Sequence, residues 1–326
     1  MVEFELRCQC GDYDTAAGVL LGIDIDFLTL WGHYRLTIDL HQRLQGHLSD
    51  PTIKAASTNN LGTCHLRIGQ TARAIELYGQ ALTIYRAIGD PRGEAADLGN
   101  LGNCYAALGQ IPRSIELHEQ ALTIHRAIGN LHGEAIVLNS LGDAYVALRL
   151  WSQAAGHQQR AIDLADAIGF AQTQSDARLS LAMTLLFSGN PPGAEQAIDA
   201  AVKFPYPPTQ PAIALVAGIA HLLQHSTTAA AQAFEEALNK GREQLKDTPD
   251  NYAALDATAL ALCGLALTGG GAHATPAAAT FHVARAITAA PGIVSQVLRL
   301  FDTMDNADPT GAIHHIRAAA AGVDRR

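Results

Sequence analysis

The chain has 326 residues and a formal net charge of −9, and it is 48% hydrophobic but only 6% aromatic. The negative charge, the presence of only four lysines and the lack of a basic cluster argue against a surface that binds nucleic acid or an acidic membrane. The five cysteines lack zinc-type spacing, and the longest apolar stretches, 212–220 and 257–267, are too short to span a bilayer. No basic-then-apolar leader opens the chain, so we expect a reduced, cytoplasmic protein.

Residues 1–54 are predicted to be degenerate copies of a helix-pair repeat that becomes regular further along the chain. Residues 11–20 resemble the second helix of such a pair, and only residues 2–10 precede them to serve as a first helix. A solenoid normally begins with a polar-faced capping element. An opening halfway through a repeat therefore indicates a piece of a longer polypeptide, or a chain that docks onto another subunit.

Residues 55–203 carry the regular repeat. Aligning 61–100 with 101–140 gives 22 identities in 40 positions. Leucines recur with the same 40-residue step at Leu61, Leu101, Leu141 and Leu181. Glycines recur at the inner turn at Gly69, Gly109 and Gly189, with Arg149 as the exception. A fixed period of this length is the signature of stacked helix pairs, because each pair needs its neighbours to complete its core.

Three copies of a motif place leucine, glycine, small and aromatic residues at matching positions. They are Leu61, Gly62, His65, Gly69, Ala74, Tyr78 and Ala81; Leu101, Gly102, Tyr105, Gly109, Ser114, His118 and Ala121; and Leu141, Gly142, Tyr145, Ala154, Gln158 and Ala161. This series resembles the tetratricopeptide repeat (TPR), whose usual period is about 34 residues. The extra residues fall in the outer turn and lengthen the second helix, as in longer variants similar to kinesin light chains and bacterial signalling proteins. The resemblance implies an all-α fold, a right-handed superhelical solenoid of antiparallel helix pairs with a 40-residue period.

After Lys203 the repeat register breaks, because four prolines lie in the segment 204–211 and a helix cannot run through them. Residues 212–326 are predicted to be degenerate helix pairs that end in a capping helix. The expected helices cover 212–224, 227–246, 251–267, 276–288, 292–304 and 309–321, with a flexible loop at 269–271.

Segments 31–46, 259–267 and 284–302 are also similar to the TPR arrays at the C-terminal end of bacterial STAND NTPases, which are signalling ATPases of the NB-ARC kind. In such proteins the array resembles a sensor, which recognises a trigger and releases the ATPase to oligomerise. No GxxxxGK[ST] phosphate loop occurs in this chain, so the NTPase would be a separate module in cis or in trans.

In TPR arrays the first helix of each pair lines the concave groove, and the resemblance carries this role to the first helices here. The candidate groove residues are the polar ones on the face opposite the repeated leucines, namely Asn59, Asn60, Thr63, Arg67, Asn100, Asn103, Asn139, Ser140 and Asp143. Asparagine is unfavourable inside a helix because it competes for local backbone hydrogen bonds. We therefore expect these amides to pair with an extended peptide or a partner helix. The alternatives are that they cap neighbouring helices or face water.

Arg67 is the one obvious cation on this face of the groove. The groove resembles that of chaperone-tail-binding TPR domains in its asparagine pairs, but it lacks their lysines. The sequence therefore argues against a dedicated clamp for a C-terminal carboxylate, and a solvated Arg67 is an equal alternative.

Other candidate sites have weaker patterns. His221 and His225 could share a helix face, as two zinc ligands must, but no carboxylate or cysteine stands at a matching spacing. His118 and His125 are expected on a second helix, either outward or packed against the next repeat. No GxSxG, HExxH or paired CxxC motif occurs, and the triple glycine at 269–271 lacks the lysine of a phosphate loop. We expect no metal, no cofactor and no enzymatic activity.

The sequence favours a non-enzymatic module that recognises a protein or peptide in its concave groove, as the sensor or regulatory arm of a bacterial STAND-type signalling or defence system. One alternative is a free-standing adaptor for assembly of a multiprotein complex, with Trp31 and the half-repeat N-terminus as a docking end. A second alternative is a sensor for a small peptide signal. TPR-containing quorum receptors are similar, although this chain lacks the DNA-binding head that they often carry.

Overall fold

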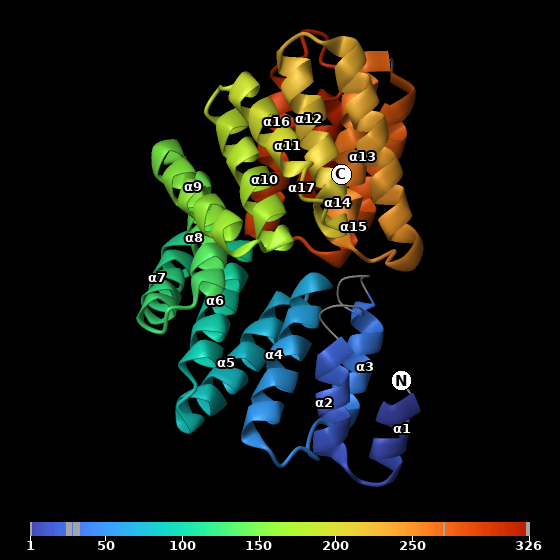
Figure 1. Cartoon of the computed structure of the whole chain (residues 1–326). Helices are drawn as coiled ribbons and strands as arrows, with labels where there is room; N and C mark the ends of the chain where they lie inside the picture. The colour runs from blue at the N-terminus through green and yellow to red at the C-terminus, as the bar shows by residue number, and fades with distance from the viewer. Residues whose placement is uncertain (1, 24–27, 29–32, 270, 324–326) are drawn as a thin grey trace.

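The computed structural model describes residues 2–23, 28, 33–269 and 271–323, which form helices and no strand (Figure 1). In chain order the α-helices are α1 (Val2–Gln9), α2 (Tyr13–Ile23), α3 (Tyr34–Leu44), α4 (Pro51–Arg67), α5 (Thr71–Ile88), α6 (Pro91–Ala107), α7 (Ile111–Ala127), α8 (Leu131–Ala147), α9 (Trp151–Ile168), α10 (Ala171–Phe187), α11 (Pro191–Ala201), α12 (Gln210–Leu223), α13 (Thr227–Asp247), α14 (Tyr252–Gly269), α15 (Ala274–Ile287), α16 (Pro291–Asp305) and α17 (Arg317–Ala321). Short 3-10 turns lie at η2 (Pro207–Thr209), η3 (Gly271–His273) and η4 (His314–Ile316). The expected all-α solenoid of helix pairs is confirmed.

The first helices of the regular region begin at side-chain caps that lie one repeat apart. Asp50, Asp90 and Asn130 each accept hydrogen bonds from backbone N–H groups two or three residues further on. These bonds satisfy donors that have no partner inside the helix. The Asp50 cap starts α4, the first helix of the regular region, at Pro51.

The two helices of a repeat approach closely because a glycine on the first helix faces a large side chain on the second. The pairs are Gly62 with Tyr78, Gly102 with His118 and Gly142 with Gln158, and a Cβ on each glycine would lie 3.0, 2.6 and 2.6 Å from that side chain. A larger residue at the glycine would push the helices apart, since protein interiors are close-packed. This contact explains why Leu-Gly recurs at the 40-residue step.

The inner turn of each repeat ends the first helix with a residue in the left-handed region, at Gly69, Gly109 and Gly189. Arg149 occupies the same place with a φ of 60°. Only glycine adopts this conformation without a steric penalty, so Arg149 carries backbone strain that its counterparts lack.

The C-terminal region follows the predicted helices with one exception. The expected helix at 309–321 is wrong in its first half, where Asp308 accepts a hydrogen bond from the backbone N–H of Thr310 and Gly311 is left-handed. The chain turns there, and only η4 and the short α17 follow; α17 packs against α15 and α16. Gly270 of the predicted loop and Trp31 of the predicted docking end lie outside the described residues.

One described helix, α14, is long and apolar enough to cross a membrane. Of its residues, 72% are buried within the fold, where it packs against α12, α13 and α15. Its apolar character is therefore that of a core helix in the C-terminal region.

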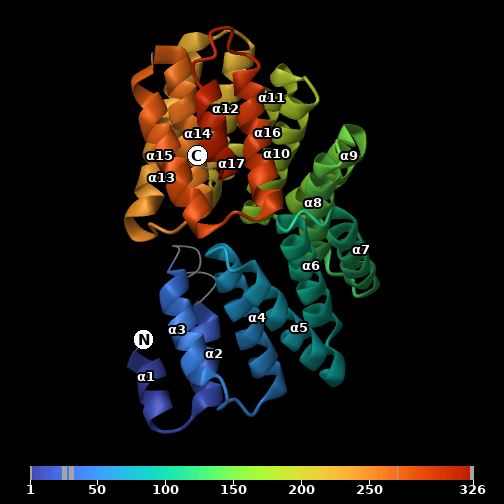
Figure 2. The ribbon, with the colours of Figure 1, turned by 180° about the vertical axis from the view of Figure 1, so that it is seen from behind.

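The solenoid curls back on itself, as both views show (Figures 1 and 2). Helices α1–α5 form one arm, α10–α17 form the other, and α6–α9 join them on one side. The arms also touch directly, because Arg35 Nε lies 2.6 Å from Asp250 Oδ2. In a second contact, α16 of the C-terminal arm packs on the end of α6 in the joining segment. At the second contact a Cβ on Gly292 would lie 1.9 Å from the carbonyl oxygen of Ala106. Part of the concave face is therefore covered by α16.

Candidate functional site on the concave face

The first helices α4, α6, α8 and α10 bring the predicted groove residues into two rows along the concave face. One row contains Asn60, Asn100 and Ser140, and the next contains Thr63, Asn103 and Asp143. The same 40-residue step extends these rows to Ser180 and Met183 on α10. The predicted residues are therefore placed on successive helices of one surface.

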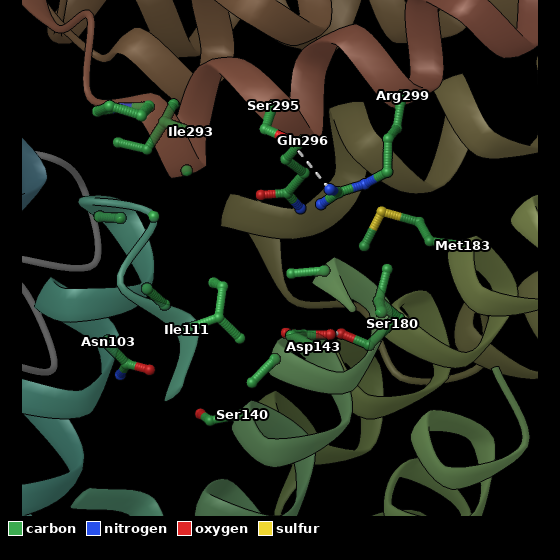
Figure 3. A pocket seen from close by; sticks show the side chains of 18 of the residues that line it. Asn103, Ile111, Ser140, Asp143, Ser180, Met183, Ile293, Ser295, Gln296 and Arg299 are labelled. Atoms are coloured by element: carbon green, nitrogen blue, oxygen red, sulfur yellow. Dashed lines mark hydrogen bonds between the residues drawn. The ribbon is translucent and has the colours of Figure 1, made fainter. Parts of the chain in front are cut away.

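A cavity of 420 Å³ lies where these rows meet α16 (Figure 3). Its lower wall is formed by the ends of α6, α8 and α10, and its upper wall by the first turns of α16. The labelled lining residues are Asn103, Ile111, Ser140, Asp143, Ser180, Met183, Ile293, Ser295, Gln296 and Arg299. Its size and its mixture of apolar walls with a few polar groups are typical of ligand sites.

Asp143 supplies the negative charge of the lower wall. Gln158 Nε2 donates to Asp143 Oδ1 at 3.2 Å, and Ser180 Oγ donates to Oδ2 at 3.4 Å. Gln158 is itself fixed, because Thr184 donates to its Oε1 at 2.7 Å. The protein surrounding Asp143 on the concave side desolvates its carboxyl group, and this raises its pKa to about 6. These hydrogen bonds hold the carboxylate in one position, but neither of its partners is a cation.

Arg299 supplies the positive charge of the upper wall. Its Nη1 donates to Ser295 Oγ at 3.1 Å, and the guanidinium lies 5.9 Å from the centre of the Phe187 ring. Burial lowers the pKa of Arg299, although the Asp143 carboxylate opposes this effect. Its buried Nε has no hydrogen-bond partner among the described residues. Asp143 and Arg299 form no direct ion pair, so the cavity presents opposite charges on opposite walls (Figure 3).

Three polar side chains of the cavity have unused hydrogen-bonding capacity. Asn103, Ser140 and Gln296 make no side-chain hydrogen bond to another described residue, although all three line the cavity. On α8, the buried Oδ1 of Asn139 also lacks a partner within the described part of the chain. An amide or hydroxyl with no protein partner can exchange its hydrogen bonds to water for hydrogen bonds to a ligand.

Two predicted groove residues are instead used inside the fold. Asn59 donates from Nδ2 to the carboxylate of Asp97, and Thr63 Oγ1 lies 3.0 Å from Tyr78 Oη. Asp97 is fully buried, and burial raises its pKa to about 7. Both side chains therefore use part of their hydrogen-bonding capacity in contacts between helices.

Arg67 lies outside this cavity, at the end of α4. It interacts electrostatically with Tyr34, Tyr206, Tyr252 and Asp176, which come from other parts of the chain. Its side chain makes no hydrogen bond or ion pair with a described residue.

The structure places the histidines that the sequence analysis singled out. His118 is buried beneath Gly102, and His221 Nδ1 lies 3.7 Å from Glu195 Oε1. His225 adopts a left-handed φ of 59° in the turn after α12. Within the described ranges, no group of three or more His, Cys, Asp or Glu side chains is arranged to hold a metal ion.

Sequence reasoning missed the upper wall of the cavity. Ser180 and Met183 could have been found by extending the repeat register, but Arg299 and Gln296 could not. They reach the site because the C-terminal helices fold back over the concave face. The repeat period in the sequence does not predict that contact.

Comparison with known families agrees with the helix-pair repeat. Residues 55–88 and 94–167 match models described as tetratricopeptide repeat. The two matches lie within the regular region and end at residue 167. TPR repeats stack into solenoids with extended concave binding surfaces, so the match supports a protein-interaction module.

Solved structures of similar fold extend the likeness to most of the chain. A Rap protein complexed with Competence and Sporulation Factor has a TM-score of 0.60 at 16% identity, over 91% of this chain and 75% of that one. The apo form of RapI has a TM-score of 0.59 at 11% identity, over 98% and 95%. Aspartyl phosphate phosphatase F from Bacillus subtilis has a TM-score of 0.59 at 13% identity, over 85% and 73%. At these identities the likeness concerns the fold. No curated protein matches the sequence.

Proposed function

We propose that the chain is a non-enzymatic recognition module that binds a segment of a protein or peptide partner on its concave face, centred on the cavity between α8 and α16. The observation that carries this proposal is the 420 Å³ cavity with Asp143 and Arg299 on opposite walls and unpaired polar side chains between them. A covered, mixed-polarity cavity of this kind suits a peptide segment with side chains and backbone groups to satisfy.

The similarity to the Rap protein supports the proposal of a recognition module, because that protein was solved in complex with a bound factor. The shape of the two chains is similar over most of this chain's length. A solenoid presents its ligand surface through curvature, so a similar curvature favours a similar use of the concave side.

The narrower proposal is that this module acts as the sensor or regulatory arm of a STAND-type signalling or defence ATPase. Its support is the resemblance of segments 31–46, 259–267 and 284–302 to such arrays. The test is whether a phosphate-loop ATPase domain is encoded in the same gene or co-purifies with the chain. An ATPase-free complex at native expression would count against it.

A free-standing adaptor is the second candidate, and one surface feature favours it. Exposed apolar side chains recur at the outer turns at Ile88, Ile128 and Ile168, with Leu131 and Phe170 beside them. A row of this kind is suited to a second protein contact. Simultaneous binding of two partners, measured by mass photometry, would support the adaptor.

The concave cavity can be tested with peptides selected on the protein itself. We would select binders from a randomised peptide display library, synthesise them and measure affinity by calorimetry. Asp143→Asn keeps the size of the side chain and removes its charge, so we expect peptides with a cationic group to bind about tenfold more weakly. Asn103→Ala should weaken binding further, because it removes an unpaired amide from the cavity.

Asp199→Asn is the matched control, because Asp199 is an exposed carboxylate on α11, away from the cavity. It should leave affinity unchanged. Peptides that bind the wild type, Asp143→Asn and Asn103→Ala equally well would exclude the cavity as the recognition site.

A further inference from the structure

A second cavity, which we call the arginine cavity, lies between the turn after α8 and the helices α16 and α17. It adjoins the Asp143 cavity, because three residues of α16 line both. Its volume is 430 Å³, and the charged residues that line it are Arg149, Arg299, Arg317 and Asp302. Three guanidinium groups and one carboxylate give this lining a net charge of +2. A positive lining of this kind attracts an anion.

Arg149 reaches the arginine cavity from the inner turn between α8 and α9. It is exposed, and its side chain makes no hydrogen bond or ion pair with a described residue. The equivalent turns have Gly69, Gly109 and Gly189, so an arginine stands here at a left-handed φ that favours glycine. Residues held in strained conformations cluster at ligand-binding sites. The unpaired guanidinium of Arg149 is therefore available to a ligand in the cavity.

The other two arginines are held in position but keep donors free. Asp302 accepts from Arg317 Nε at 2.7 Å and from its Nη2 at 2.9 Å, and neither bond uses Nη1. Arg299 donates from Nη1 to Ser295 Oγ at 3.1 Å (Figure 3), and its Nε has no partner among the described residues. Because a guanidinium has five N–H donors, both side chains can donate to a ligand without giving up these bonds.

The positive charges of the arginine cavity act on one another. Burial lowers the pKa of Arg299 and the charge of Arg149 lowers it further, whereas the Asp143 carboxylate opposes both effects. Asp143 lies on the far wall of the neighbouring cavity and does not line this one, and Asp302 is already paired with Arg317. An anion bound here would be attracted by both unpaired guanidinium groups and would offset their mutual repulsion.

We propose that the arginine cavity binds a phosphate group as its dianion, held by Arg149, Arg299 and Arg317. The planar forks of arginine match the oxygen atoms of a phosphate and can donate to them in pairs. The net charge of +2 on the lining favours a dianion over a carboxylate or another monoanion. Val294 and Leu298 add an apolar part to the lining, which suits the organic substituent of a phosphate ester.

Two sources of this phosphate group fit the cavity, inorganic phosphate in solution and a phosphorylated side chain of a partner. The inference does not depend on the proposed peptide site, because Arg149 and Arg317 do not line the Asp143 cavity. The bound phosphate would join the turn after α8, in the segment that links the arms, to α16 and α17 of the C-terminal arm. Its binding should therefore raise the Tm of the protein.

The test is calorimetric titration of the full chain with phenyl phosphate and with benzenesulfonate at constant ionic strength. The two ligands carry the same ring and a tetrahedral anionic group. At about pH 7.5 the phosphate ester is mainly a dianion, because its second pKa lies near 6, whereas the sulfonate is a monoanion. We expect phenyl phosphate to bind with millimolar or tighter affinity, and about tenfold more tightly than benzenesulfonate.

Variants then identify the residues that hold the phosphate. Arg149→Gln and Arg317→Gln should each weaken the binding of phenyl phosphate by about fivefold or more. Arg149→Gly should weaken it as much while relieving the strained φ, so a loss of binding in this variant would not come from unfolding. Arg160→Gln is the matched control, because Arg160 is exposed on α9 and does not line the cavity. Asp143→Asn should not weaken phosphate binding, which separates this site from the proposed peptide cavity.

Relative affinities assign the source of the phosphate group. A phosphoserine peptide amide that binds about tenfold more tightly than inorganic phosphate would assign the cavity to a phosphorylated side chain, and equal or weaker binding of the peptide would assign it to free phosphate. Three results would overturn the proposal: no binding of phenyl phosphate at millimolar concentration, equal affinities for phenyl phosphate and benzenesulfonate, or binding that is unchanged in both Arg149→Gln and Arg317→Gln.

Discussion

Asn59 on α4 donates a hydrogen bond to the buried carboxylate of Asp97 on α6, 38 residues further along the chain. Asp97 has no exposed surface, and its second oxygen has no hydrogen-bond partner among the described residues. A buried carboxylate with one amide partner is more stable when protonated, and burial accordingly raises its pKa to about 7. Adjacent repeats are therefore joined by a contact that depends on pH.

Asp97→Asn should change how the free energy of unfolding depends on pH. An unfolded Asp ionises near pH 4, so between about pH 4 and 7 the native state keeps a proton that the unfolded state has lost. Asp97 therefore makes the wild type less stable as pH rises through this window. We expect Asp97→Asn to gain stability relative to the wild type from pH 4 to 8, by up to about 4 kcal/mol.

Urea unfolding of both proteins across this pH range measures the difference, which cancels the contribution of the other ionisable groups. Asp163→Asn, an exposed position on α9, serves as the control and should give a difference independent of pH. A constant difference for Asp97→Asn would contradict the role of burial at this site.

His118 should produce the opposite pH dependence. Burial beneath Gly102 lowers its pKa to about 4, whereas an unfolded histidine has a pKa near 6.5. The unfolded state binds the extra proton as the pH falls from about 6.5 to 4, so the fold loses stability in that window. Tyr78 occupies the same register one repeat earlier and packs on Gly62. His118→Tyr should therefore fold and remove an acid destabilisation of about 3 kcal/mol.

Thermal unfolding at pH 7 and at pH 4.5 compares His118→Tyr with the wild type. We expect the variant to have the higher Tm at the acidic pH only. A His282→Tyr variant on α15 controls for the added ring, and an equal gain in it would show that the effect is not due to His118.

The repeat period predicts where some residues of the candidate site lie, but it does not predict the others. The 40-residue step placed Asn100, Asn103, Ser140 and Asp143 on one surface, because stacked repeats put equivalent residues on the same face. The step could not distinguish Asn59, since its use depends on Asp97, a carboxylate at a position where the neighbouring repeats have Ser57 and Val137.

Arg299 is one of the site residues whose position the repeat period does not predict. Whether α16 reaches α6 depends on the rotation between repeats summed over the whole solenoid, and small errors at each repeat add together. The repeat period says nothing about Tyr34, Tyr206 and Tyr252, because all three lie in the degenerate regions on either side of the regular repeats, or at their end. For these residues the sequence predicts the helices and turns that contain them, but not how far apart the residues lie in the folded chain.

Arg149→Gly should stabilise the protein. The left-handed φ of 60° costs an L-residue about 1–2 kcal/mol, and glycine gives back part of this gain through the greater entropy of the unfolded chain. We expect a net increase of up to about 1 kcal/mol in the free energy of unfolding, measured in urea. Arg149→Ala also removes the arginine side chain but keeps the strained left-handed backbone. It should therefore not increase the free energy of unfolding. Equal stability of the two variants would contradict the strain.

Gly292→Ala should open the contact between α16 and α6. The added Cβ would lie 1.9 Å from the carbonyl oxygen of Ala106 and 2.9 Å from that of Ala107, and a backbone oxygen cannot move aside as a flexible side chain can. We expect faster amide hydrogen exchange in α16 and a larger radius of gyration by small-angle scattering. Gly79→Ala is the control, since a Cβ there meets nothing within 4 Å, and it should stabilise α5 by up to about 1 kcal/mol. If Gly292→Ala remained as compact and as protected as the wild type, the upper wall of the cavity would not depend on this contact.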